Sequence, residues 1–184
     1  MSYSFPQEPN GKGYAPAEVD EFIAKARRQF EDPSQFLVSS GLARHATFSL
    51  VKGGYAIAAV DAAIDRLEDT FAQKELAKAR AEQGDFAMDD RLARYVDSLQ
   101  GRINRPKGKR FKRAGWPLRG YSPKQVDALC QTIERFLVSG ASLSSTDVRN
   151  QLFKAKRGGY AENQVDAFLD RTIEVIQLRK ALSK

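Results

Sequence analysis

The sequence predicts an all-α protein made of two small helical units that are joined by a basic linker. Three observations support this fold class. A short motif occurs four times, apolar residues recur at helical spacing after every copy, and no segment alternates polar and apolar residues as a substantial sheet requires. Repeated helical units more often build binding or assembly surfaces than one catalytic pocket, so the repeats also bear on function.

Every copy of the motif begins with Gly-Tyr and ends with Val-Asp. The copies read GYAPAEVD, GYAIAAVD, GYSPKQVD and GYAENQVD. Their tyrosines are 41, 66 and 39 residues apart, which makes a pair, an interruption and a second pair. We interpret this as a two-motif unit duplicated in tandem. The residues assigned to the structural motif are Gly13, Tyr14, Val19, Asp20, Gly54, Tyr55, Val60, Asp61, Gly120, Tyr121, Val126, Asp127, Gly159, Tyr160, Val165 and Asp166.

The chain is predicted to have three segments. Residues 3–83 hold the first motif pair, residues 84–110 hold an inserted helix and the basic linker, and residues 111–184 hold the second pair. The flanks support this pairing, because Phe5 and Phe111 precede the first tyrosine of each pair by similar distances. One motif alone leaves an apolar helix face uncovered, so each pair is expected to fold on itself.

Each motif is predicted to open a helix. Its glycine allows a sharp reversal of the chain, Pro16 and Pro123 suit a first helical turn, and Ser122 is a candidate N-cap. The following apolar residues mark one helix face: Val19, Phe22, Ile23, Ala26 and Phe30; Val60, Ala63, Ile64, Leu67 and Phe71; Val126, Leu129, Cys130, Ile133 and Leu137; Val165, Phe168, Leu169, Ile173 and Ile176.

Shorter helices are predicted before the second and fourth motifs. Ser144 to Asp147 is typical of a helix start and leads into Val148 and Leu152, and residues 36–48 play the matching part. The insertion is predicted to form a helix from about Asp89 to Gly101, followed by a loop or linker over residues 102–115. The motif tyrosines are expected to satisfy their hydroxyls locally, and the motif aspartates to pair with or cap a neighbouring helix.

The fourth copy has a pattern that extends beyond the octapeptide. A short helix ending in Phe, a loop, Gly-Tyr and Val-Asp-Phe-Leu are matched by Asp147, Val148, Asn150, Phe153, Gly159, Tyr160, Val165, Asp166, Phe168 and Leu169. The second copy matches through Phe48, Gly54, Tyr55, Val60, Asp61 and Ile64. In these residues the chain resembles the N-terminal domain of the DivIVA family of bacterial cell-division and polarity proteins, in its actinobacterial repeat type. The resemblance implies a scaffold linked to division or polar growth.

The chain departs from the family pattern in two places. Family members continue into a long parallel coiled coil, whereas this chain ends at Lys184, about two turns after Ile176, so no such coil is expected. Members also insert an exposed aromatic, followed by a basic residue, into the membrane from the loop before Gly-Tyr. The second and fourth copies lack this aromatic. The third copy offers Leu118-Arg119 with Trp116 nearby and is the best candidate for that contact.

The basic charge gathers in one segment. Residues 102–119 contain eight cations and no acidic residue, and subtracting these eight from the net charge of +7 leaves −1 for the rest. Three interpretations stay open: a solvated linker, a contact with anionic lipid, and a contact with nucleic acid. The candidate contact residues are Lys107, Lys109, Arg110, Phe111, Lys112, Arg113, Trp116, Leu118 and Arg119.

Catalysis is not expected. His45 and Cys130 are the only histidine and cysteine, no phosphate-binding glycine loop is present, and we predict no metal site and no cofactor. Cys130 is predicted to be a small buried hydrophobe. No apolar run approaches the roughly 20 residues of a membrane span, and the N-terminus does not resemble a signal peptide. A cytoplasmic protein is therefore expected, and the resemblance implies a place at the inner face of the membrane at septum or pole.

We therefore predict a non-catalytic scaffold or adaptor that acts through protein–protein contacts with other division or polarity proteins and at an anionic membrane surface. The alternative is a nucleic-acid-binding protein that uses residues 102–119. Two oligomeric states are open, a monomer of pseudo-dimers and a homodimer.

Overall fold

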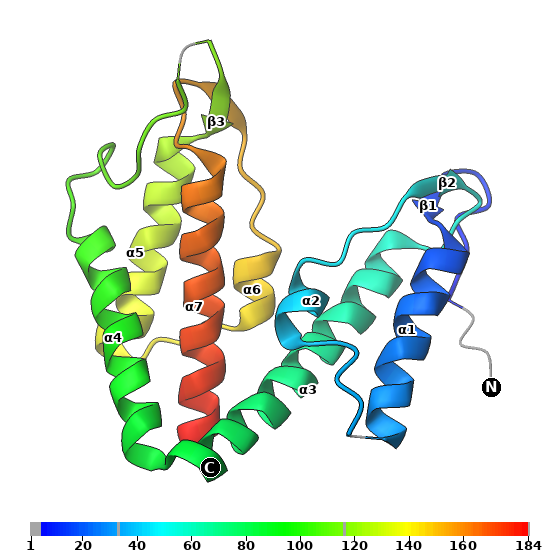
Figure 1. Cartoon of the computed structure of the whole chain (residues 1–184). Coiled ribbons are helices and arrows are strands. Elements are labelled where there is room, and N and C mark those ends of the chain that lie inside the picture. Colours follow the sequence, from blue (N-terminus) through cyan, green and yellow to red (C-terminus); the bar gives the residue numbers. More distant parts are fainter. Residues whose placement is uncertain (1–4, 33, 116, 184) are drawn as a thin grey trace. The chain divides into compact units, whose positions relative to one another are not determined.

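The computed structural model describes residues 5–32, 34–115 and 117–183. These residues are mostly helical, with strands of only three residues, so the prediction of a mainly α fold is confirmed (Figure 1). The predicted first segment starts at residue 3, and its first two residues lie outside the described residues. Among the described residues, no helix is long and apolar enough to cross a membrane.

The chain divides into two compact units. Unit 1 is Met1–Lys78 and unit 2 is Ala79–Lys184. Unit 1 contains, in chain order, β1 (Lys12–Tyr14), α1 (Pro16–Glu31), α2 (Ser40–Arg44), β2 (Leu50–Lys52) and most of α3 (Ile57–Gln83). Unit 2 contains α4 (Asp85–Ile103), β3 (Arg119–Tyr121), α5 (Pro123–Ser139), α6 (Ser145–Arg149), β4 (Ala155–Arg157) and α7 (Glu162–Leu182). From β3 onward, unit 2 repeats the element order of unit 1.

Each unit has a small antiparallel ribbon beside its helices. β1 pairs with β2, with Lys12 opposite Lys52 and Gly13 opposite Val51. β3 pairs with β4 in the same way, with Arg119 opposite Arg157. Every motif tyrosine lies in a strand or forms a bridge to one, and the motif helix starts two residues after its tyrosine. The ribbon therefore holds the starts of the two motif helices of a unit together.

The two cores use the predicted stripes to different extents. The whole third stripe is buried, including Cys130 and Ile133, which are inaccessible to solvent. The first stripe is only partly covered, because Ile23 is half-buried and Phe30 is 37% exposed. The motif stripes are therefore buried more completely in unit 2 than in unit 1, and in unit 2 α4 packs against both motif helices.

The inserted helix differs from its prediction in bounds and in role. α4 begins at Asp85 and ends at Ile103, so Gly101 lies inside the helix and does not end it. It packs against α5 and α7, with Leu99 and Ile103 buried in the core of unit 2 (Figure 1). The boundary between the two units lies within α3, after Lys78. Residues 84–110 are not a linker between the units, because the apolar side chains of α4 pack into the core of unit 2.

The structure confirms one predicted helix start, at Ser144, and corrects two other predictions, for Leu152 and Ser122. Ser144 caps α6, and it forms a capping box with Asp147. α6 ends at Arg149, and Leu152, predicted on its apolar face, is 91% exposed. Ser122 lies at the N-cap position of α5, but its side chain makes no capping hydrogen bond.

Candidate functional site

The two Gly-Tyr dipeptides of each unit lie back to back. In unit 1 the backbone N–H of Tyr14 donates to the carbonyl of Tyr55 over 2.9 Å, and Tyr55 donates back to Tyr14 over 2.8 Å. In unit 2 Tyr121 and Tyr160 form the same reciprocal pair, with distances of 2.9 and 2.8 Å. The motifs therefore act in pairs, each completing the other.

The motif glycines are required by space at this crossing. A Cβ atom on Gly13 would lie 2.2 Å from the carbonyl oxygen of Tyr55, and one on Gly120 would lie 2.1 Å from that of Tyr160. On the opposite side, a Cβ on Gly159 would lie 2.4 Å from the carbonyl oxygen of Gly120. Such approaches exclude any side chain. The predicted reason, a sharp reversal, applies instead to the preceding glycines such as Gly53, whose φ is 68°.

The tyrosine hydroxyls reach the aspartates of the other motif. Tyr55 donates to both carboxylate oxygens of Asp20 over 3.2 Å, and Tyr160 donates to Asp127 over 3.1 Å. The reverse pairs form as well: Tyr14 hydrogen-bonds to Asp61, and Tyr121 hydrogen-bonds to Asp166. The expectation of a locally satisfied hydroxyl is therefore wrong. From the sequence, the aspartates are expected to pair with or cap a neighbouring helix. Instead, each pairs with a tyrosine just before the other motif helix.

These contacts alter the acidity of the tyrosines. Burial raises the pKa of Tyr14, Tyr55 and Tyr160 above its ordinary value, and a nearby aspartate charge raises it further. Burial, followed by the charge of Asp166, raises the pKa of Tyr121 to about 12. The crossing therefore holds neutral hydroxyls that donate to carboxylates, an arrangement suited to joining helices.

Unit 2 adds a buried cation to its crossing. Arg110 is 5% exposed, and its guanidinium donates to the backbone carbonyls of Ile103 and Asp127, each over 3.0 Å. It also lies 3.7 Å from the carboxylate of Asp127, which accepts a 2.7 Å hydrogen bond from the N–H of Gly108. Arg110 thereby neutralises the carboxylate that binds Tyr160.

Burial removes two predicted contact residues from the surface. Besides Arg110, Phe111 is 3% exposed, and its ring packs against Tyr160 and Phe168 at centroid distances of 5.1 and 5.3 Å. Neither side chain is accessible to lipid or nucleic acid. The periodicity of the sequence did not reveal this, since both residues lie in a run of cations that is typical of a solvated loop.

The other predicted contact residues divide into three groups. Arg113 is exposed but bound, because it donates to the carbonyls of Gly158 and Gly108 over 2.9 and 2.7 Å. Trp116 lies outside the described residues. The exposed ones are Lys107, Lys109, Lys112, Leu118 and Arg119.

The ribbons carry like charges in opposition. Arg119 faces Arg157 across β3 and β4, and Lys12 faces Lys52 across β1 and β2. Like charges at such positions destabilise a sheet. Exposed leucines accompany them, Leu118 at 64% and Leu50 at 52%. We call these places the basic tips: Lys12, Leu50 and Lys52 in unit 1, and Leu118, Arg119 and Arg157 in unit 2.

Among the described residues, no group of three or more His, Cys, Asp or Glu side chains could hold a metal ion. Cys130 is fully buried, as predicted, and burial raises the pKa of its thiol to about 11. Comparisons of the chain with protein-family models, curated proteins and solved structures find no match.

Proposed function

We propose that this protein is a non-catalytic scaffold or adaptor of bacterial cell division or polar growth, and that it acts through contacts with other proteins. The carrying observation is that all four motifs are used to join helices, in two units that share one element order from their first strand onward. Because the motif residues stabilise the fold, the exposed helix surfaces are available to bind partners, as in other repeat proteins. The link to division and polarity rests on the resemblance to the DivIVA family.

Localisation of the full chain in its native cell tests this proposal. A fluorescent fusion is expected to concentrate at the septum or the poles. The Gly120→Ala fusion, whose crossing is disrupted, serves as the control and is expected to spread through the cell. A uniform signal from the unchanged fusion would contradict the division and polarity role.

We further propose that the basic tips contact an anionic membrane surface. The opposed cations favour an anionic partner. Leu118, next to Arg119, and Leu50, on the same strand as Lys52, favour a partner with an apolar interior. Nucleic acid is the less favoured alternative, because Phe111, the aromatic in the described part of residues 102–119, is buried and cannot stack on bases. The membrane alternative predicts tighter binding to anionic vesicles, and the nucleic-acid alternative predicts tighter binding to DNA.

A further inference from the structure

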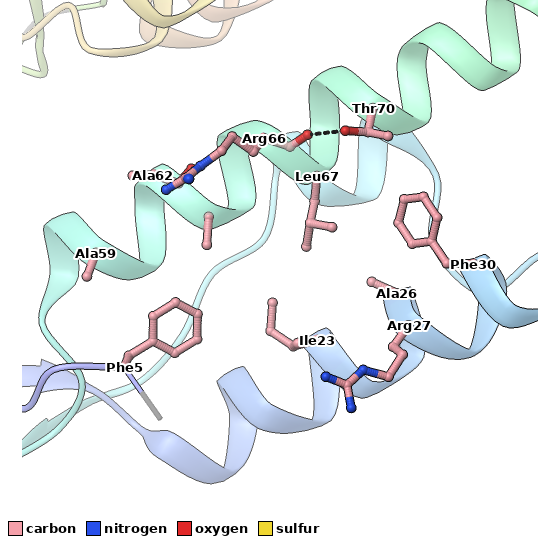
Figure 2. A pocket seen from close by; sticks show the side chains of 11 residues that line it. Phe5, Ile23, Ala26, Arg27, Phe30, Ala59, Ala62, Arg66, Leu67 and Thr70 are labelled. Atoms are coloured by element: carbon pink, nitrogen blue, oxygen red, sulfur yellow. Dashed lines mark hydrogen bonds between the residues drawn. The ribbon is translucent and has the colours of Figure 1, made fainter. Parts of the chain in front are cut away.

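Unit 1 has an open groove between its two long helices. The groove has a volume of about 600 Å³ and lies between α1 and α3 (Figure 2). Ile23 and Leu67 point toward each other from the two helices, with Phe5 and Phe30 toward the two ends. Arg27 and Arg66 are the charged residues of its lining.

The corresponding place in unit 2 is filled. Aligning Tyr14 with Tyr121 matches Ala26 with Ile133 and Phe30 with Leu137. Aligning Tyr55 with Tyr160 matches the groove residues Ala63, Leu67 and Thr70 with Phe168, Thr172 and Val175. These counterparts in unit 2 are all buried, with exposures of 8% or less, whereas Phe30 is 37% exposed and Thr70 is exposed.

Helix α4 provides this cover in unit 2. Tyr95 of α4 lies under the guanidinium of Arg171, 3.8 Å from it, and Arg171 is the counterpart of Arg66. Arg102 of α4 lies 5.2 Å from the ring of Phe111. Phe111 is the counterpart of Phe5, since each ring packs on the second tyrosine of its pair. α4 thus occupies the groove that stays open in unit 1.

The rims of the two grooves differ in charge. Unit 1 has cations at both positions, Arg27 and Arg66. Unit 2 has Glu134 where unit 1 has Arg27, and Arg171 where it has Arg66. An occupant of the groove in unit 1 therefore meets two cations, whereas the same two positions in unit 2 carry one cation and one anion. Charge complementarity of this kind selects partners.

We propose that the groove of unit 1 binds an amphipathic helix of a partner protein, one with an α4-like apolar stripe flanked by acidic residues. The inference rests on the proposed adaptor function and names the surface through which it works. The partner helix lies along α1 and α3 as α4 lies along α5 and α7, and its apolar residues cover Ile23, Phe30 and Leu67. Its carboxylates face Arg27 and Arg66.

Binding of a helical peptide to the full chain tests the inference. The probe is a labelled peptide of residues 85–103 that carries Arg91→Glu and Arg94→Glu, measured by fluorescence anisotropy. The acidic peptide is expected to bind, and the Arg27→Glu, Arg66→Glu chain is expected to weaken its Kd by roughly tenfold or more. Arg28→Glu, an exposed change on α1 outside the groove lining, is the control and is expected to leave the Kd within about twofold.

Three results would overturn the inference. They are no binding of the acidic peptide, binding that is unaffected by the Arg27→Glu, Arg66→Glu pair, and self-association of the unchanged chain that this pair abolishes. Self-association of this kind would identify a second copy of the chain as the occupant of the groove. Sedimentation velocity detects the self-association. If the chain concentrates at the septum or poles but does not bind the peptide, the proposed adaptor function stands and the proposed groove site is wrong. If the chain binds the peptide but stays diffuse in the cell, the groove site stands and the proposed division or polarity role is wrong.

Discussion

At the scale of single residues, the motif glycines are set by backbone contact across the crossing. A Cβ on Gly120 would lie 2.1 Å from the carbonyl oxygen of Tyr160 and 2.9 Å from its carbonyl carbon. Because both atoms belong to the backbone, Gly120→Ala is expected to separate β3 from Tyr160 and to destabilise unit 2 by about 3 kcal/mol. Urea unfolding followed by circular dichroism measures this change.

Gly101→Ala is the matched control. Gly101 lies inside α4, and a Cβ there would have nothing within 4 Å. Alanine is expected to stabilise the helix by about 1 kcal/mol. Equal destabilisation by the two substitutions would contradict the steric account of the motif.

The hydroxyls of the second tyrosine in each pair differ in burial. Tyr160 is fully buried, binds Asp127 and accepts a 3.3 Å hydrogen bond from the N–H of Arg110, whereas the partner of Tyr55 is the exposed Asp20. Tyr160→Phe is expected to destabilise the protein by about 1–3 kcal/mol, because buried groups lose a partner. Tyr55→Phe is expected to cost less than about 1 kcal/mol, since water replaces the lost bond. Urea unfolding compares them, and a larger effect at Tyr55 would contradict this order.

The raised pKa of the tyrosines predicts a loss of stability in alkali. The neutral hydroxyl is favoured in the folded state, so this stability is fully present below the ordinary pKa of 10.0 and is lost as the pH rises through the folded value, about 12 for Tyr121. The midpoint of urea unfolding is expected to fall over this range. It should fall less in Tyr121→Phe, and equal slopes in the two proteins would contradict the assignment.

At the scale of elements, α4 is the cover of the helix pair in unit 2. Leu99 and Ile103 are 1% and 2% exposed, so replacing either with alanine is expected to destabilise unit 2 by about 2–5 kcal/mol. Phe86→Ala on the same helix is the control, because Phe86 is 86% exposed and its loss should change little. Thermal unfolding followed by circular dichroism measures the effect.

Because α4 packs into the core of unit 2, a stable fragment of unit 2 is expected to include α4. A fragment of residues 111–184, the third segment predicted from the sequence, lacks α4 and with it the buried side chains of Leu99 and Ile103. It is therefore expected to unfold at a lower urea concentration than a fragment of residues 84–184. Equal midpoints would show that α4 contributes little to the stability of unit 2.

At the scale of the whole molecule, the charge of +7 matters through its placement. Reversing Arg119 and Arg157 to Glu removes the opposed pair of one basic tip. Each cation near an anionic surface contributes about 1 kcal/mol, so binding to phosphatidylglycerol vesicles is expected to weaken by at least tenfold. Vesicle co-sedimentation measures this change, and added salt should weaken the binding further.

Reversal of Lys107 and Lys109 to Glu is the matched control, because it makes the same change in net charge at exposed positions outside the ribbons. The basic tips account for vesicle binding only if this control binds more tightly than the tip variant. Binding to double-stranded DNA that exceeds binding to vesicles, and that the lysine pair abolishes, would favour the nucleic-acid alternative.

The sequence by itself determined the helices and their pairing into two repeats. Helical periodicity after each Gly-Tyr and the intervals between the tyrosines are local patterns, and they predict local structure. The helix start at Ser144 and the burial of Cys130 were also predictable, because a capping sequence and an apolar helix stripe are both local patterns.

Only the tertiary structure decided what the motifs contact. The crossing of Gly13 with Gly54, the bond from Tyr160 to Asp127 and the burial of Arg110 and Phe111 join residues that lie far apart along the chain or outside any periodic pattern. The same holds for α4, which covers one groove and leaves its counterpart in unit 1 open. A stripe of apolar residues indicates that a helix face needs a cover, but packing in three dimensions decides which segment supplies it.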